Sequence, residues 1–86
     1  MQKSAIFDII KNLIIKRLGV DTRLVTPKAK FIHDLGLDSL DYAELIMEFE
    51  TTFDINIPDE DTEGIVFVSD AVDYVHQKLS AKSSKP

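Results

Sequence analysis

The sequence predicts an all-α protein, a small bundle of three main helices plus one short helix, with a long loop between the first and second helices. Three observations predict this fold class. Apolar residues recur at helical spacing in three separate stretches, and no stretch alternates with the period of a strand. Capping residues or glycine also stand where those stretches begin or end. The length of 86 residues is that of a single domain.

The first helix is predicted from Ser4 to Leu18. Gly19 provides a C-terminal stop, and Lys16 and Arg17 suit the negative end of the helix dipole. The apolar residues at helical spacing are Ile6, Ile10, Leu13 and Ile14.

The following 19 residues, from Gly19 to Leu37, contain no helix of normal length. Helices in bundles are usually joined by about two to eight residues, and longer connections are commonly functional. Thr26 and Pro27 are expected to open one short turn, since proline is preorganised for a first helical position. The segment that leads into residue 38 is therefore a candidate for a functional role.

The second main helix is predicted to begin at Asp38. Asp38 is a suitable cap, Asp41 follows in a capping-box-like position, and Leu37 is placed to contact Tyr42. The apolar face consists of Leu40, Ala43, Ile46, Met47, Phe49 and Phe53.

Asp41, Glu44 and Glu48 form an acidic ridge along this helix, with Glu50 nearby. The sequence predicts that these carboxylates are unpaired and repel one another, which a basic partner would relieve.

Two further helical segments are expected. Pro58 opens a short turn through residues 59–61, and Ser69 caps a third main helix that ends near Ser80. The apolar face of that helix comprises Ala71, Val72, Val75 and Leu79. Residues 1–80 would form the domain, and residues 81–86 a flexible basic tail.

The net charge of −5 is unevenly distributed. Residues 1–30 carry +5, residues 31–70 carry −12 with no Lys or Arg, and residues 71–86 carry +2. Such a central segment is repelled by nucleic acid and by anionic lipid, and it favours a basic protein surface. Judged by charge alone, the alternative is that this acidic segment faces solvent and binds no partner.

Composition excludes several other classes of site. The absence of cysteine excludes disulfides, thiolate metal sites and a cysteine nucleophile. The longest purely apolar run, residues 65–68, has four residues and is too short to span a membrane. The first residues lack the pattern of a signal or transit peptide, so we expect a cytoplasmic protein.

Ser39 is the leading candidate for a functional residue. It follows Gly36 and the long loop, and it lies in the first turn of a helix, where free backbone N–H groups and the dipole favour a phosphate ester. Serine at a helix start is often only a cap. Here Asp38 is the better cap, which leaves the Ser39 hydroxyl free to point outward.

A hydrolase with Ser39 as nucleophile is an unfavoured alternative. His33, Asp34 and His76 are the available partners, but the segment lacks the second glycine of a nucleophile elbow. Tyr42 and Tyr74 are interpreted as packing residues with solvated hydroxyls rather than catalytic acids.

A calcium-binding helix–loop–helix module is a second alternative. Acidic residues occupy positions 1, 3, 5 and 12 of an EF-hand-like loop, and glycine and isoleucine occupy positions 6 and 7. The residues are Asp59, Asp61, Glu63, Gly64, Ile65 and Asp70. Glutamate at position 5, phenylalanine at position 9 and aspartate at position 12 depart from that pattern. A short acidic helical turn followed by a loop is the competing interpretation.

The run from Asp34 to Asp41, D-L-G-L-D-S-L-D, followed by Glu44-Leu45 and Glu48-Phe49-Glu50, resembles the prosthetic-group segment of acyl carrier proteins. Residues 53–61 and 71–75 are similar to that family's next loop with its short helix and to its last helix. The resemblance extends over roughly residues 5–79. The D-S-L core is specific only within this context.

The resemblance implies a non-catalytic carrier. Ser39 would receive 4′-phosphopantetheine from coenzyme A through a phosphopantetheinyl transferase, and the thiol of the arm would carry acyl groups as thioesters. Synthases, reductases, dehydratases and acyltransferases would dock through basic patches onto a surface consisting of Asp38, Leu40, Asp41, Glu44, Met47 and Glu48. Phe49, Ile57 and Ile65 would help to shelter the acyl chain. A monomer is expected.

Some residues depart from the family pattern. Thr51 and Thr52 replace acidic residues, and Tyr42 is large for a position beside the arm. Fatty-acid synthesis is the first expectation for the pathway, and a specialised lipid or polyketide-type pathway is the alternative.

Overall fold

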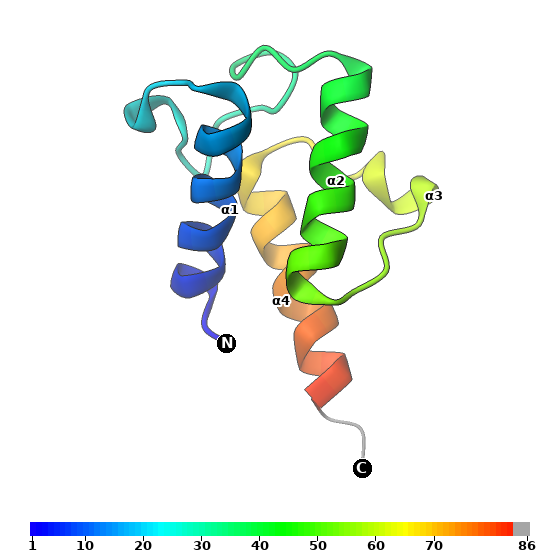
Figure 1. Cartoon of the computed structure of the whole chain (residues 1–86). Coiled ribbons are helices and arrows are strands. Elements are labelled where there is room, and N and C mark those ends of the chain that lie inside the picture. The colour runs from blue at the N-terminus through cyan, green and yellow to red at the C-terminus, as the bar shows by residue number, and fades with distance from the viewer. Residues whose placement is uncertain (84–86) are drawn as a thin grey trace.

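The computed structural model describes residues 1–83, which form four α-helices and one turn of 3-10 helix (Figure 1). The elements are α1 (Lys3–Leu18), η1 (Thr22–Leu24), α2 (Ser39–Phe53), α3 (Asp59–Thr62) and α4 (Val68–Ser83). No β-strand forms within these residues, although Lys30 and Phe67 make an isolated antiparallel bridge. The predicted all-α class, with three main helices and one short helix, is confirmed.

The helices α1, α2 and α4 pack around an apolar core, and α1 contacts both of the others. Ile6, Ile10 and Ile14 provide the buried stripe of α1, as their spacing predicts. Leu45 and Phe49 of α2 are fully buried against it. No polar or charged residue among those described is buried, so side-chain burial in this small domain is an apolar effect.

The ends of α1 and α2 follow local capping rules. Gly19 adopts a left-handed conformation with φ 67°, and its N–H donates to the Ile15 carbonyl at 2.8 Å, which ends α1 as predicted. Asp54 ends α2 in the same conformation, with φ 55°. This is an uncommon conformation for a residue other than glycine. Lys82 stabilises it, since its Nζ donates to both the carbonyl and the carboxylate of Asp54.

The long loop differs from expectation in its detail. Its short helical turn lies at Thr22–Leu24 and is capped by Asp21, whereas Pro27 stands inside a β-turn closed by the Ala29 N–H and the Thr26 carbonyl at 3.1 Å. Proline suits the second position of such a turn because its φ is already set. A short turn does open at Thr26 and Pro27, as predicted, but it is a β-turn and not a helical one.

Backbone hydrogen bonds join the long loop to the start of α4. The N–H of Phe31 donates to the Val66 carbonyl at 3.1 Å, and the N–H of Val68 donates to the Ala29 carbonyl at 2.9 Å. The buried loop residues are Val25, Ala29, Phe31, Leu35 and Leu37. The loop thus contributes to the core instead of lying over it, and this sets the position of the segment that enters α2.

Helix α4 begins and ends differently from the prediction. Its first residue is Val68, and the carboxylate of Asp70 accepts the N–H of Phe67 at 3.0 Å, so Ser69 is not the cap. The Ser69 N–H instead donates to the Pro27 carbonyl at 2.9 Å. At the other end, the helix runs to Ser83 rather than stopping near Ser80.

The extension of α4 corrects part of the predicted tail. Residues 81–83 are helical, and Lys82 forms an ion pair with Asp54 at 2.6 Å. This long-range pair holds the last turn against the end of α2. Residues 84–86 of the predicted tail lie outside the described residues, and the separation of an 81–86 tail from the carrier domain stays a prediction.

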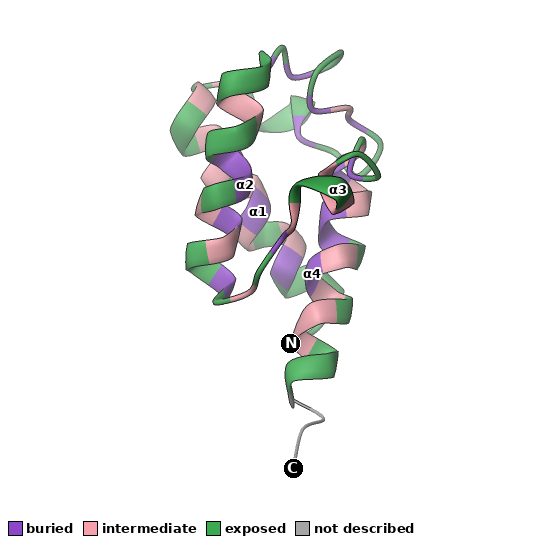
Figure 2. Cartoon of the chain, turned by 90° about the vertical axis from the view of Figure 1, so that its right-hand side faces the viewer, coloured by how far each residue is buried: buried purple, intermediate pink, exposed green. Residues whose placement is uncertain are grey.

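Helix α3 has no buried residue of its own, in contrast to the main helices beside it (Figure 2). Its acidic residues Asp59, Glu60 and Asp61 lie in the first turn, where the helix dipole favours them. Apolar anchoring of α3 therefore comes from the buried residues on either side of it, Ile57 and Ile65.

Candidate functional site

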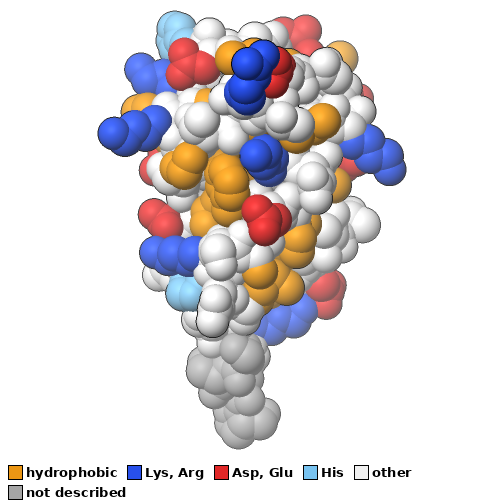
Figure 3. Space-filling model, turned by 90° about the vertical axis from the view of Figure 1, so that its left-hand side faces the viewer, with side chains coloured by type: hydrophobic (Ala, Val, Ile, Leu, Met, Phe, Trp, Pro, Cys, Tyr) orange, Lys and Arg blue, Asp and Glu red, His pale blue; other side chains and the backbone are white. Residues whose placement is uncertain are grey.

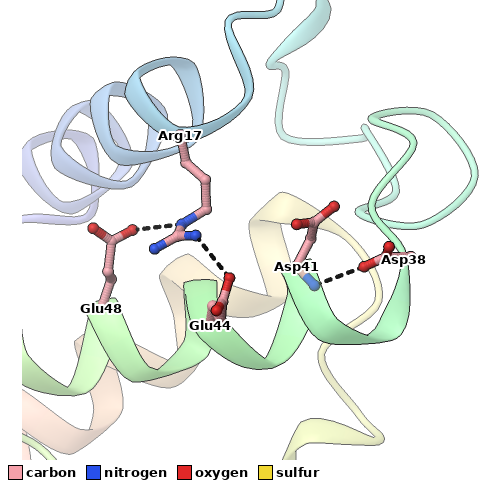
Figure 4. Close-up of polar contacts among 5 residues, drawn as sticks. All are labelled: Arg17, Asp38, Asp41, Glu44 and Glu48. Atoms are coloured by element: carbon pink, nitrogen blue, oxygen red, sulfur yellow. Dashed lines mark hydrogen bonds and ion pairs between the residues drawn. The ribbon is translucent and has the colours of Figure 1, made fainter.

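The candidate site is the N-terminal end of α2, where Ser39 is the first helical residue and is exposed. The preceding residue, Asp38, is the N-cap, and its carboxylate accepts the Asp41 N–H at 2.7 Å (Figure 4). The prediction that Asp38, and not Ser39, caps this helix is confirmed. The Ser39 side chain is consequently not required for capping.

Several contacts hold the segment before Ser39 in place. The carboxylate of Asp34 accepts the Lys30 N–H at 2.8 Å, and the Leu37 N–H donates to the Phe31 carbonyl at 3.2 Å. Leu37 is buried, while Gly36 supplies a positive φ of 74°. This φ is accessible to glycine without steric cost. The chain is thereby turned so that a buried residue and an exposed serine stand two positions apart.

Neither histidine forms a hydrogen bond with Ser39 in the described residues, which include both His33 and His76. A serine nucleophile needs a base within hydrogen-bonding reach and a group that orients it. The structure therefore offers no support for the hydrolase alternative.

Two apolar side chains of α2 remain in solvent. Leu40 is 65% exposed and Met47 is 62% exposed, although both had been placed on the apolar face of the helix. Exposed large apolar residues flanked by charges are typical of contact surfaces for other proteins. They lie on the same helix as the acidic residues.

Two of the three carboxylates in the acidic ridge, Glu44 and Glu48, are paired, contrary to prediction. Arg17, in the last turn of α1, donates from Nε to Glu48 at 3.0 Å and from Nη1 to Glu44 at 3.1 Å (Figure 4). The hydrogen bond that Arg17 donates to Glu48 is the main cause that raises the pKa of Arg17, with smaller contributions from the charges of Glu48, Glu44 and Asp41. Sequence reasoning noticed Arg17 only as a residue near the end of a helix.

Glu50 is also engaged, although it was grouped with the ridge. Its carboxylate accepts the Ile57 N–H at 2.9 Å, before Pro58. It acts as a structural residue at the entry to α3 rather than as part of an exposed acidic surface.

Tyr42 links α2 to the end of α3. Its hydroxyl lies 2.7 Å from the carbonyl oxygen of Ile65 and 2.9 Å from that of Thr62, and its single proton is shared between them. Burial, and secondly the charge of Asp70, raises the pKa of Tyr42 to about 12. The prediction of a solvated hydroxyl was wrong, because the target carbonyls are brought near only by the tertiary fold.

Tyr74 makes the corresponding contact from α4. Its hydroxyl donates to Asp61 of α3 at 2.6 Å. Desolvation is the first cause that raises the pKa of Tyr74, followed by the hydrogen bond and charge of Asp61. Two tyrosine hydroxyls, one from each side, thus hold the short helix that lacks buried residues.

Tyr42 also lines two hollows beside the site. One, of about 310 Å³, is bounded mainly by the loop around Phe31 and by Ile65 and Val66. The other, of about 160 Å³, lies between α2 and α3 and is lined in part by Ile46 and Ile57. Of the residues expected to shelter an acyl chain, Ile57 and Ile65 line these hollows, whereas Phe49 is fully buried in the core.

The EF-hand-like loop does not form. Asp59 to Thr62 are helical, Asp61 accepts the Tyr74 hydroxyl, and Asp70 accepts backbone N–H groups of Val66 and Phe67. Among residues 1–83, no group of three or more His, Cys, Asp or Glu is arranged to hold a metal ion. The calcium-binding alternative is therefore not supported by the geometry.

On the side that α1 occupies, Lys and Arg side chains are spread among acidic and hydrophobic ones, and they do not gather into a single patch (Figure 3).

Within residues 1–83, no helix is both long and apolar enough to cross a bilayer.

Comparison with known proteins agrees with the geometry at the start of α2. Residues 8–75 match the family described as "Phosphopantetheine attachment site". The chain is 53% identical over 75 residues to "Acyl carrier protein" from Karelsulcia muelleri (strain GWSS), which covers 87% of this chain and 90% of that protein. A match over most of both chains shows common descent of the whole domain. The chain belongs to the acyl carrier proteins, non-catalytic carriers that work with a 4′-phosphopantetheine group.

Proposed function

We propose that Ser39 is the attachment residue for 4′-phosphopantetheine. The observation that carries this proposal is the exposed Ser39 hydroxyl at the first position of α2, beside an N-cap already supplied by Asp38. The first N–H groups of a helix have no intrahelical acceptor, and the helix dipole is positive there. A phosphodiester on Ser39 would therefore lie in a favourable electrostatic position.

When bound, the arm supplies the thiol that carries an acyl group as a thioester. The chain contributes a fixed anchor and a recognition surface, while the separate transferase provides the base that activates Ser39. The absence of a bonded histidine at Ser39 accords with this division of roles. The alternation of buried Leu37 with exposed Ser39 keeps the anchor outside the core.

The docking surface is proposed to comprise six residues along α2: Asp38, Leu40, Asp41, Glu44, Met47 and Glu48. Its acidic members favour encounters with a basic enzyme surface, and its two exposed apolar residues add contact area. Electrostatic steering gives fast association without requiring high affinity, which suits a carrier that visits several enzymes.

The proposed partners are a phosphopantetheinyl transferase and the synthases, reductases, dehydratases and acyltransferases of acyl-chain metabolism. Fatty-acid synthesis in the cytoplasm is the proposed setting, with the protein acting as a monomer. The mainly apolar hollow beside Tyr42, which Ile65 lines, supports shelter of a bound acyl chain, and Ile57 lines a smaller neighbouring hollow of mixed polarity.

Intact mass spectrometry tests the attachment residue. The protein would be incubated with coenzyme A, Mg²⁺ and a broad-specificity phosphopantetheinyl transferase, beside Ser39→Ala and Ser69→Ala variants. We expect the parent and Ser69→Ala to gain one phosphopantetheinyl group and Ser39→Ala to gain none. Fragmentation would place the added mass on the peptide that contains Ser39. A gain in Ser39→Ala, or placement on another serine, would refute the assignment.

A further inference from the structure

Arg17, which is not part of the proposed docking surface, pairs with some of the carboxylates of that surface and leaves the others unpaired. Glu44 and Glu48 both receive hydrogen bonds from Arg17, whereas Asp38 and Asp41 make no ion pair with any described residue. Residues 31–70 contain no Lys or Arg, so any counterion for this surface must come from elsewhere in the chain or from another molecule. Within the described part of the chain, Arg17 takes this role at Glu44 and Glu48.

Arg17 is well placed to hold this position. It belongs to the last turn of α1, immediately before the Leu18–Gly19 stop, and α1 packs directly on α2. Only 29% of its side chain is exposed. The guanidinium contacts the two carboxylates with two different nitrogen atoms, which fixes its orientation as well as its charge.

The same guanidinium lies beside one of the exposed apolar residues. Arg17, Glu44, Glu48 and Met47 line one surface hollow of about 390 Å³, which Thr51 and Thr52 complete. A partner side chain that reaches Met47 therefore meets Arg17. The Asp38–Leu40–Asp41 end of the surface is not part of this hollow.

We propose that Arg17 is a specificity-determining residue that competes with the cationic side chains of a docking partner for Glu44 and Glu48. This inference rests on the proposed docking surface. A basic partner enzyme binds the free carboxylates at the Ser39 end without competition, but it must displace Arg17 to pair with Glu44 and Glu48. The free protein thus presents a shorter acidic surface than its sequence indicates.

The competition is modest in strength. Exposed ion pairs are individually weak and are screened by salt, so Arg17 is displaced readily by a well-oriented cation. Its effect is a selective increase in the KM of a partner that uses Glu44 and Glu48. A partner confined to the Ser39 end gains nothing from removal of Arg17. The transferase is assigned to the first kind, because the docking surface proposed for it includes Glu44 and Glu48.

The probe is the transferase reaction itself, followed by its KM for the carrier at low and high salt. Arg17→Gln and Lys16→Gln are a matched pair, since each removes one positive charge from the same helical turn, and no ion pair of Lys16 occurs among the described residues. Glu48→Gln is measured in the parent and in the Arg17→Gln background. Circular dichroism melts establish that each variant is folded under the assay conditions.

We expect Arg17→Gln to lower the KM by about two- to fivefold at low salt, more than Lys16→Gln does, with the difference disappearing at high salt. Glu48→Gln should raise the KM more in the Arg17→Gln background than in the parent, because only there is Glu48 free for the transferase. Equal KM values for the matched pair, a higher KM for Arg17→Gln, or equal effects of Glu48→Gln in both backgrounds would overturn the inference. Failure of the proposed function itself looks different, since the folded parent would then gain no mass at Ser39.

Discussion

The hydroxyl of Tyr42 on α2 lies 2.7 Å from the backbone carbonyl oxygen of Ile65, just beyond α3. The ring also meets Phe31 of the long loop edge-on, with centroids 5.8 Å apart. One side chain therefore joins three segments that are remote in sequence. Since α3 buries no side chain of its own, hydrogen bonds of this kind add to the burial of Ile57 and Ile65 in holding it in place.

Tyr42→Phe tests the contribution of the hydroxyl. It keeps the ring against Phe31 but removes the donor to Thr62 and Ile65. We expect the free energy of unfolding to fall by about 1 kcal/mol, the usual net value of such a bond. For a domain of this size that corresponds to a melting temperature lower by about 4–8 °C. A thermal melt followed by circular dichroism measures it, and an unchanged melting temperature would show that the hydroxyl is as well satisfied by water.

Alkaline pH should weaken the fold through the same hydroxyl. In the folded protein the pKa of Tyr42 is raised from 10.0 to about 12, because burial disfavours the phenolate. Its stabilising contribution is complete below the unfolded pKa near 10, and it is lost as pH rises through the folded pKa near 12. Urea unfolding at a series of pH values should show a smaller alkaline loss of stability in Tyr42→Phe than in the parent. Parallel pH curves for the two proteins would contradict this expectation.

Asp38 has two separable roles, capping and charge. Asp38→Ala removes the acceptor for the Asp41 N–H and should lower stability by about 0.5–2 kcal/mol. Asp38→Asn keeps a good cap but removes the charge, so it should retain near-parental stability. Its KM in the transferase reaction should nevertheless rise, and more at low salt than at high salt. Equal losses of stability in the two variants would argue against the capping role.

Leu40 and Met47 should affect partners more than folding. Because the two side chains are 65% and 62% exposed, Leu40→Ala and Met47→Ala should leave the melting temperature nearly unchanged. Each should raise the KM for a docking enzyme, since apolar contact is lost at the interface. Leu24→Ala, at another exposed apolar position outside the proposed surface, is the matched control. A similar KM for all three variants would remove Leu40 and Met47 from the docking surface.

Local signals predicted the parts of the fold that depend on nearest neighbours. The stop at Gly19 and the cap at Asp38 both involve partners within four residues, and the structure contains both. The isoleucine stripe of α1 was equally readable, because helical periodicity alone selects one face. Ser39 emerged from the same local reasoning, since the cap preference at Asp38 left its hydroxyl unused.

Where a local signal competed with a tertiary one, the local prediction failed. Ser69 is a good cap by type, but the loop around Lys30 bridges to Phe67, and α4 begins at Val68, two residues before the start that a Ser69 cap would give. Lys82 belonged to a predicted flexible tail, yet its bond to Asp54, 28 residues away, retains it in the last turn of α4.

The sequence by itself determined the helical class, the beginning of α2 and the exposure of a serine there, because each depends on spacing and capping within a few residues. Only the tertiary structure decided which carboxylates remain available and which hydroxyls are bonded. Arg17 pairs with residues 27 and 31 positions away, and Tyr42 with carbonyls 20 and 23 positions away. No periodicity encodes such pairs, since they exist only once α1, α2 and α3 have packed together.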